Sequence, residues 1–220
     1  MGDLSFADIL SAFWLTIQLA LFSAVGALIL GTIIAVMRVS PVRVLQLVGT
    51  WYVNTFRNTP LTLLMVFGVL GATYILGINL APSSITDNNF RWAVVMLSVY
   101  HAAFVCEALR SGVNTVPAGQ AEAARAIGLT FNQTMSQVIL PQAFRGAIAP
   151  LGSTMIALIK NTTVAAVIGN QEAAGLMSET VENQGSSIGL FLIFALGFVI
   201  LTLPLGLLFT SMSRRLVVKR

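Results

Sequence analysis

Long apolar segments alternate with short polar connections along the chain, and this pattern predicts helices that cross a membrane. A run of about 20 apolar residues is enough for an α-helix to cross roughly 30 Å of hydrocarbon. The sequence therefore predicts an all-α membrane protein, with residues 1–220 forming one domain of five transmembrane helices. The expected spans cover residues 13–37, 60–78, 92–110, 143–168 and 188–212.

The composition is that of a membrane protein rather than a soluble domain. Hydrophobic residues make up 56% of the chain and charged residues 9%, whereas roughly 25% of the residues in a soluble domain are charged. The single cysteine, Cys106, excludes an internal disulfide framework. The first apolar run is too long for a signal peptide, so we expect it to be a retained helix.

The second span is expected to be irregular. Residues 44–56 before it are also apolar, and together with 60–78 they would form a single helix about 52 Å long. Such a helix is too long for a perpendicular crossing. We therefore expect an interfacial or tilted helix first, with Pro60 bending the chain or marking the start of the crossing.

The basic residues gather on one side of the predicted spans, and positive charge favours the cytoplasmic side. Arg91 lies on the opposite side, where the acidic residues gather, and Lys160 falls inside a span. We therefore expect the N-terminus outside and the C-terminus in the cytoplasm. The basic residues assigned to the cytoplasm are Arg38, Arg43, Arg57, Arg110, Arg125, Arg145, Arg214, Arg215, Lys219 and Arg220; the acidic residues assigned to the outside are Asp3, Asp8, Asp87, Glu172, Glu179 and Glu182.

A polar, helix-forming segment at 117–141 interrupts the apolar pattern between the third and fourth spans. Pro117 suits the first turn of a helix, and Gly128 suits a left-handed stop after it. A second short helix is expected over 131–139, ending at Pro141 just before the fourth span. The segment is therefore predicted to form a cytoplasmic helical hairpin.

The first helix of this hairpin combines small and charged side chains. Ala123 and Ala124 stand beside Glu122 and Arg125. A helix with a small face can seat in a groove of a partner while its charges fix the register. A solvated cytoplasmic loop explains the same residues, and both interpretations remain open at this point.

A spaced motif runs from Glu122 to Pro141. It reads Glu-Ala-Ala, three residues, Gly, nine residues, a β-branched residue, one residue, and Leu-Pro. This pattern resembles the EAA motif of ATP-binding-cassette (ABC) importer permeases, with Val138 where Ile is usual. The segments 57–60, 107–130, 138–152 and 158–169 resemble the permeases for polar amino acids, the His/Glu/Gln/Arg group. Asn58 stands where that family commonly has Gly, and Asn161 where it commonly has Asp.

The resemblance implies a prokaryotic inner-membrane importer built from several subunits. Two five-helix permeases, identical or paralogous, would form the pathway in lipid, with two ATPase subunits beneath and an extracytoplasmic amino-acid-binding protein above. A coupling helix would dock in each ATPase through Glu122, Ala123, Ala124, Arg125 and Gly128. Nothing in the resemblance implies a nucleic-acid partner.

The chain itself is not expected to be an enzyme or to hold a cofactor. Its lysines are Lys160 and Lys219, and neither ends a Gly-x-x-x-x-Gly-Lys-Ser/Thr phosphate loop. ATP and Mg²⁺ are therefore expected on the partner ATPase.

A polar run at Lys160, Asn161, Thr162 and Thr163 lies inside the fourth span. Charged residues within spans usually face a bundle interior or a water-filled cavity. One hypothesis is that the Lys160 ammonium meets a substrate carboxylate, while Asn161 and the threonine hydroxyls add hydrogen bonds. The alternative is that Lys160 extends to the outer interface or pairs with Glu107.

A second polar cluster, Arg57, Asn58 and Thr59, precedes the second span. Arg57 could line the cytoplasmic end of the pathway or anchor at the lipid headgroups. Glu107 and Arg110 are spaced to form a structural ion pair.

His101 and the acidic outer segment give weaker indications. The single histidine, His101, is interpreted as a packed or hydrogen-bonded helix residue. The segment with Glu172, Glu179 and Glu182 fits either a solvated loop or a contact with the binding protein.

An amide at position 161, where the family commonly has an acid, removes negative charge from the expected pathway. Charge matching then disfavours cationic substrates and favours glutamate, aspartate or glutamine; the alternative is that the binding protein sets the specificity. The alternative function is a secondary amino-acid carrier or channel that acts alone, but such carriers often contain inverted repeats, and no repeat is visible. An intramembrane enzyme lacks support, because the sequence contains no His-Glu-x-x-His motif, no paired intramembrane carboxylates and no serine–histidine arrangement at a useful spacing.

Overall fold

The computed structural model describes residues 4–185 and 188–216, and their secondary structure is helical without any strand. This confirms the predicted all-α class. Asp3, Lys219 and Arg220, which contributed to the expected orientation, lie outside the described residues.

Four helical segments in the described part of the chain are long and apolar enough to cross a membrane. They are α1 (Phe6–Val39), α4 (Ile85–Asn114), the run Phe131–Ile168, and α9 (Ile188–Leu216). A fifth crossing is present if a bent pair of helices counts as one span. The expectation of five spans therefore depends on that pair.

The bent pair consists of α2 (Arg43–Asn58), followed by α3 (Leu61–Val66) and the π-helical turn η1 (Phe67–Ile75). The two parts meet at an angle of 100°. The bend falls at Thr59 and Pro60, as the sequence predicts, because proline disfavours helical backbone in the residue before it and has no N–H to donate. Thr59 is accordingly extended, with φ −93° and ψ 132°.

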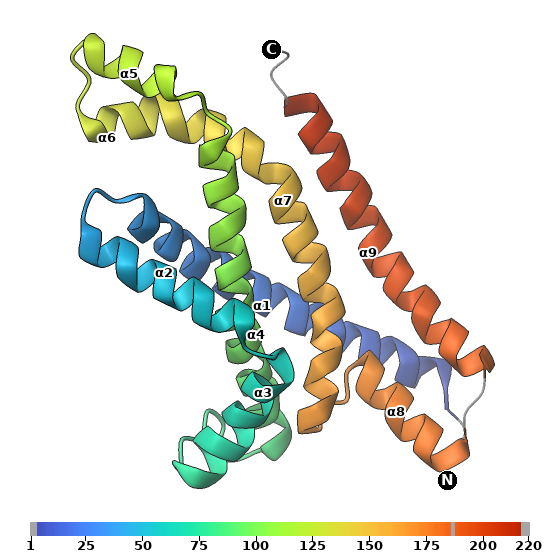
Figure 1. Cartoon of the computed structure of the whole chain (residues 1–220). Helices are drawn as coiled ribbons and strands as arrows, with labels where there is room; N and C mark the ends of the chain where they lie inside the picture. Colours follow the sequence, from blue (N-terminus) through green and yellow to red (C-terminus); the bar gives the residue numbers. More distant parts are fainter. Residues whose placement is uncertain (1–3, 186–187, 217–220) are drawn as a thin grey trace.

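The core of the molecule is α4, which lies between α1 and α7 (Leu140–Asn161) (Figure 1). Glycines allow the backbones to approach closely. A Cβ atom on Gly31 of α1 would lie 2.6 Å from the Val105 side chain, and one on Gly112 of α4 would lie 2.3 Å from the carbonyl oxygen of Ala143. Each glycine therefore lets the backbone of α4 lie close to one of these neighbours.

The fourth span belongs to a continuous helical run. The run comprises α6 (Phe131–Gln133), the π-helical turn η2 (Thr134–Ile139), α7, and the 3₁₀ segment η3 (Thr162–Ile168). The expectation that Pro141 ends a separate helix is wrong. The chain instead stays helical through Pro141, at the junction between η2 and α7. A π-helical turn departs from the regular α-helical hydrogen-bond pattern, so the missing N–H of Pro141 falls where that pattern already changes.

The polar segment forms the predicted helical hairpin, which projects at one end of the molecule (Figure 1). Pro117 caps α5 (Ala118–Ala126), and Gly128 adopts φ +88° at its end. The Ala124 carbonyl accepts a hydrogen bond from the Leu129 N–H, which closes the turn. The local stop signals in the sequence therefore predict this turn correctly.

The segment between the fourth and fifth spans contains a helix that the sequence analysis missed. This helix, α8 (Ala173–Gln184), begins at the N-cap residue Glu172. The following helix, α9, packs along α7 and also contacts α1: Gly152 of α7 allows Phe209 to approach, and Phe13 of α1 stacks on Phe194. Most of its other large apolar side chains are exposed.

Candidate functional site

A cavity of about 360 Å³ lies between α4 and α7. Its lining mixes aromatic rings with hydroxyl and amide groups, and no carboxylate contributes to it. The lining residues are Tyr100, His101 and Phe104 of α4 and Ser153, Thr154, Ala157 and Asn161 of α7. Asn161 is the one predicted substrate residue among them.

His101 and Asn161 form a hydrogen bond across this cavity wall. His101 Nδ1 lies 3.0 Å from the Leu97 carbonyl oxygen, and its Nε2 lies 3.1 Å from Asn161 Nδ2. A carbonyl oxygen only accepts, so Nδ1 carries the proton and Nε2 accepts from the Asn161 amide. The pair is therefore neutral, and the amide oxygen of Asn161 is left available to the cavity.

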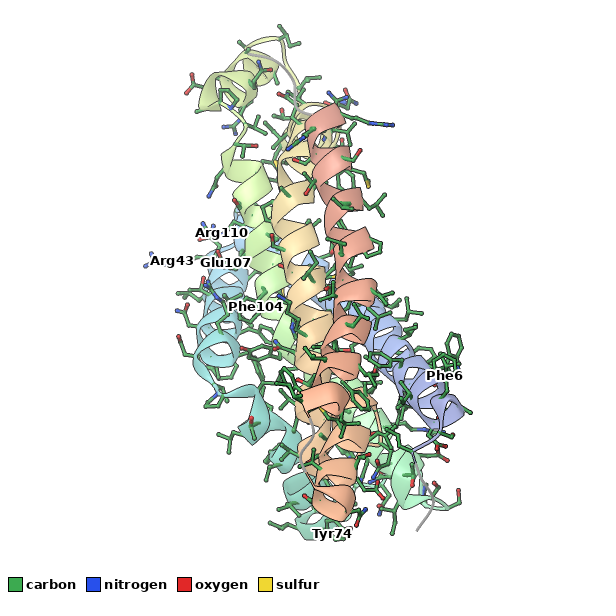
Figure 2. All side chains as sticks on the ribbon, turned by 90° about the vertical axis from the view of Figure 1, so that its right-hand side faces the viewer. Phe6, Arg43, Tyr74, Phe104, Glu107 and Arg110 are labelled. Carbon is green, nitrogen blue, oxygen red and sulfur yellow. The ribbon has the colours of Figure 1, made fainter. Side chains whose placement is uncertain are left out.

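Arg57 approaches the same cavity from α2. Its guanidinium carbon lies 5.5 Å from the ring centroid of Phe104, a cation–π distance. Phe104 lies near mid-height of the molecule (Figure 2). The bend after α2 thus brings Arg57 close to the cavity that Asn161 lines, although the two residues are far apart in the sequence.

The other residues of the polar run in the fourth span do not line the cavity. Lys160 is exposed. Consecutive residues of a helix are about 100° apart around its axis, so Lys160 lies on a different side of α7 from Asn161. Thr162 is fully buried and donates to the Ile159 carbonyl, while Thr163 donates to the Lys160 carbonyl. Both hydroxyls are therefore used within the helix.

Asn58 and Thr59 likewise hydrogen-bond within their own helix. The Asn58 side-chain amide lies 2.7 Å from the Asn54 carbonyl, and the Thr59 hydroxyl lies 2.8 Å from the Thr55 carbonyl. Of the second polar cluster, only Arg57 approaches the cavity.

The sequence contains one indication of the cavity residues that sequence reasoning missed, which is their helical spacing. On α4, Phe104 follows Tyr100 by four residues and His101 by three. On α7, residues of the cavity recur every four positions, at Ser153, Ala157 and Asn161. Such spacings place side chains on one face of a helix. The sequence does not indicate, however, that these two faces meet.

The expected ion pair between Glu107 and Arg110 is confirmed, with 3.1 Å between the Glu107 carboxylate and Arg110 Nη2. The same carboxylate also forms an ion pair with Arg38 at the end of α1, which the sequence analysis did not foresee. Glu107 and Arg110 lie on α4 between Phe104 and the hairpin (Figure 2). The alternative pairing of Glu107 with Lys160 does not occur.

The hairpin exposes most of the residues proposed to contact a partner. Glu122, Ala123, Arg125 and Gly128 are exposed, whereas Ala124 is 5% exposed. Ile127 is 79% exposed, which is unusual for a large apolar side chain in water. The tip of the hairpin therefore presents charged, small and apolar groups together.

Glu172 is fully buried, so the interpretation of this residue as part of a solvated loop is wrong. Its carboxylate accepts hydrogen bonds from the N–H groups of Ala174, at 2.9 Å, and Gly175, at 3.0 Å. Thr16 of α1 lies 3.5 Å away. Burial raises the pKa of the Glu172 carboxyl to about 7, against the lowering effect of these hydrogen bonds.

The described residues offer no obvious metal centre. Across 4–185 and 188–216, no three His, Cys, Asp or Glu side chains come together in a way that could hold a metal ion. The chemistry of the cavity is that of hydrogen bonding and charge.

Comparisons with known proteins give a consistent result. The family model for the "binding-protein-dependent transport system inner membrane component" matches residues 27–218. The chain is 53% identical over 218 residues to the glutamate transport system permease protein GluC of Corynebacterium glutamicum, covering 97% of this chain and 96% of that protein. It is 34% identical over 211 residues to the glutamate transport system permease protein GluD of the same organism, covering 94% of this chain and 74% of that protein.

A solved structure resembles the whole chain. The crystal structure of an amino acid ABC transporter with histidines contains a chain that superposes with a TM-score of 0.85 at 25% identity. The match covers 97% of this chain and 100% of that chain.

Proposed function

Because the chain belongs to the family of binding-protein-dependent transport system inner membrane components, we propose that it carries glutamate across the inner membrane as a permease subunit of an ABC importer. It is a transport subunit and not an enzyme. The alternative of a carrier that acts alone is not favoured, since the family and its solved relative are ABC systems.

The cavity between α4 and α7 supports an acidic substrate. At neutral pH glutamate carries two carboxylates and one ammonium group. The Arg57 guanidinium near Phe104 provides a cation at one side of the cavity, and guanidinium groups bind carboxylates through two parallel hydrogen bonds. The neutral pair of Asn161 and His101 places no negative charge opposite it, and this is the observation that carries the proposal.

The remaining residues of the two polar clusters have supporting roles. The exposed Lys160 ammonium adds positive potential beside the cavity and attracts an acidic substrate without lining the site. Thr162, Asn58 and Thr59 shape the backbone around the site, because their side chains hydrogen-bond within their helices.

The hairpin couples the permease to a separate ATPase. Glu122, Ala123, Arg125 and Gly128 are exposed and available for docking, while Ala124 is packed inside the hairpin. A short helix of this kind fits a groove on the ATPase. Since the chain lacks a phosphate loop, ATP and Mg²⁺ are bound by that partner.

The working transporter contains further subunits. A second permease completes the pathway. Corynebacterium glutamicum has two glutamate transport system permease proteins similar to this chain, GluC and GluD, which supports a paralogue in that role. An extracytoplasmic binding protein delivers the amino acid. In this assembly the N-terminus lies outside, and the hairpin and the C-terminus lie in the cytoplasm.

The function is tested by reconstituting the complete transporter in vesicles with its binding protein. We expect ATP-dependent uptake of glutamate, with arginine transported poorly. In the Asn161→Asp variant a new negative charge faces the substrate, and we expect glutamate uptake about tenfold lower because like charges near a protein surface repel by a few kcal/mol at most.

Asn79→Asp provides the matched control, because Asn79 is exposed, does not line the cavity and bonds only to the nearby Gly77 carbonyl. This change should leave glutamate uptake within about twofold, as exposed surface substitutions usually have small effects. Equal uptake of glutamate and arginine, or equal loss in both variants, would refute the proposed site.

A further inference from the structure

Helices α1 and α4 meet in an ion cluster that the transport site does not use. The Glu107 carboxylate on α4 contacts Arg38 of α1 and Arg110 of α4. The three side chains are partly buried, with 24% of Glu107, 13% of Arg38 and 38% of Arg110 exposed. Glu107 therefore carries the single negative charge between two cations.

Arg38 also brings α2 into this cluster. Its side-chain stem packs against Gly49 of α2, where a Cβ atom would lie only 2.7 Å from Arg38 Cγ. Its Nη1 atom lies 4.0 Å from the sulfur of buried Cys106 on α4. A cation also suits the last turn of α1, where the helix dipole is negative. Arg38 thus touches α2 through its stem and α4 through its guanidinium.

The cluster lies on α4 between the cavity and the hairpin. Phe104 of the cavity precedes Glu107 by less than one turn. Towards the other end, α4 continues from Glu107 to Asn114, about 10 Å along the helix axis. The chain then enters the hairpin at Pro117. Any movement of the hairpin that reaches the cavity through α4 must pass this point.

We propose that Glu107 is a positioning residue that makes α1, α2 and α4 move as one unit when the hairpin is displaced. Arg57 of α2 then keeps its place over Phe104 of α4, while the unit shifts against α7 and changes the cavity between them. This role rests on the proposed function, because it requires the hairpin to be driven by an ATPase.

The three residues of the ion cluster do not contribute equally, because one anion, Glu107, is shared by two cations, Arg38 and Arg110. Replacing Glu107 by Gln leaves Arg38 and Arg110 facing each other without a counter-charge, and leaving a partly buried charge unpaired is costly. Replacing Arg38 by Gln leaves Glu107 still paired with Arg110. We therefore expect the effect of Glu107→Gln to exceed that of Arg38→Gln, with Arg38→Lys close to the unmodified protein.

The experiment measures uptake and ATP hydrolysis together in the reconstituted complete transporter. Glu107→Gln should keep ATP hydrolysis that responds to the binding protein, but the ATP used per glutamate should rise about tenfold. Arg38→Gln should raise the ATP used per glutamate a few-fold. Asp87→Asn at the opposite end of α4 is the matched control, since Asp87 is exposed, and its ratio should not change.

A proportional fall of uptake and hydrolysis in both Glu107→Gln and Arg38→Gln, with an unchanged ratio, would overturn the proposal and leave the cluster a purely stabilising one. If Glu107→Gln fails to assemble, the ratio in the milder Arg38→Gln variant decides the question. Absence of ATP-driven glutamate uptake by the unmodified transporter would instead refute the proposed function.

Discussion

At the scale of single residues, the carboxyl group of Glu172 combines a helix-capping position with burial. It caps the N-terminus of α8, where the helix dipole favours a negative charge, yet it is fully buried. Burial dominates and raises its pKa from the ordinary 4.5 to about 7. Thr16 is the polar side chain that reaches it from α1.

This raised pKa predicts a pH-dependent stability. In the unfolded chain Glu172 ionises near its ordinary pKa, whereas in the folded protein it stays protonated up to about pH 7. The folded state is therefore favoured at low pH, and that advantage, at most about 3 kcal/mol, is lost as the pH rises from about 4.5 to 7. We expect the thermal unfolding midpoint in detergent to fall over this range.

The Glu172→Gln variant isolates this contribution, because its side chain does not ionise. Subtracting its melting curve from that of the unmodified protein removes the effect of all other titrating groups. Glu179→Gln serves as the control, since Glu179 is exposed on the same helix. A Glu172→Gln variant with the same pH dependence as the unmodified protein would contradict the prediction.

Some of these residue-level features could be predicted from the sequence, and others depend on tertiary packing. Pro60 and Gly128 act through their own backbone, so the bend and the left-handed turn were foreseeable. Asn161 was identified as a pathway residue, but its partner His101 lies 60 positions away. A single sequence does not indicate which faces of two helices meet.

At the scale of elements, the hairpin depends on the backbone of Gly128, which has φ +88°. Residues with a Cβ atom pay roughly 1–2 kcal/mol to adopt this left-handed conformation. Gly128→Ala should therefore loosen the hairpin while leaving the bundle intact. Hydrogen exchange should become faster across residues 118–139 and stay unchanged in α1 and α4.

Gly119 offers a matched control within the same hairpin. A Cβ atom would meet nothing within 4 Å at either glycine, but Gly119 lies inside α5 without a positive φ. Gly119→Ala should leave exchange unchanged or slower, because alanine favours a helix. Equal acceleration in both variants would show that the turn conformation is not what holds the hairpin.

The boundaries of elements were predicted less well than their existence. Pro141 was expected to stop a helix, but the chain stays helical through it, at the junction where the π-helical turn η2 already changes the hydrogen-bond pattern. The helix α8 was missed because its sequence, AAGLMSETVENQ, has neither a long apolar run nor a strong periodicity. Hydrophobicity locates spans reliably, whereas short helices outside them depend on caps such as buried Glu172.

At the scale of the whole molecule, the transport elements are arranged along one axis. The cavity, the ion cluster and the hairpin follow one another on or beside α4, from Phe104 through Glu107 to Pro117. Helices α1 and α7 both pack against α4, and α1 crosses behind it in Figure 1. A force applied at the hairpin therefore has a direct mechanical route to the cavity that we propose as the substrate site.

The same arrangement predicts the topology of the chain in the membrane. The turn between α1 and α2, the hairpin and the C-terminal end of α9 all lie in the upper half of Figure 1, and α8 lies near the opposite end. If the bent pair of α2 with α3 and η1 crosses the membrane, Arg38, Arg43, Arg125, Arg145 and Arg214 share one side, as the preference of basic residues for the cytoplasm requires. If the pair were re-entrant, these arginines would be divided between both sides.

Accessibility of single cysteines to a membrane-impermeant thiol reagent separates the two topologies. With five crossings, Phe6→Cys and Ser83→Cys react from outside intact cells, and Gly119→Cys reacts only after the membrane is opened. With four crossings, Gly119→Cys would share the side of Phe6→Cys, and Ser83→Cys would be on the other side. The native Cys106 is buried, so the unmodified protein provides the background. We expect the five-crossing pattern, because only this pattern places the hairpin where a cytoplasmic ATPase can reach it.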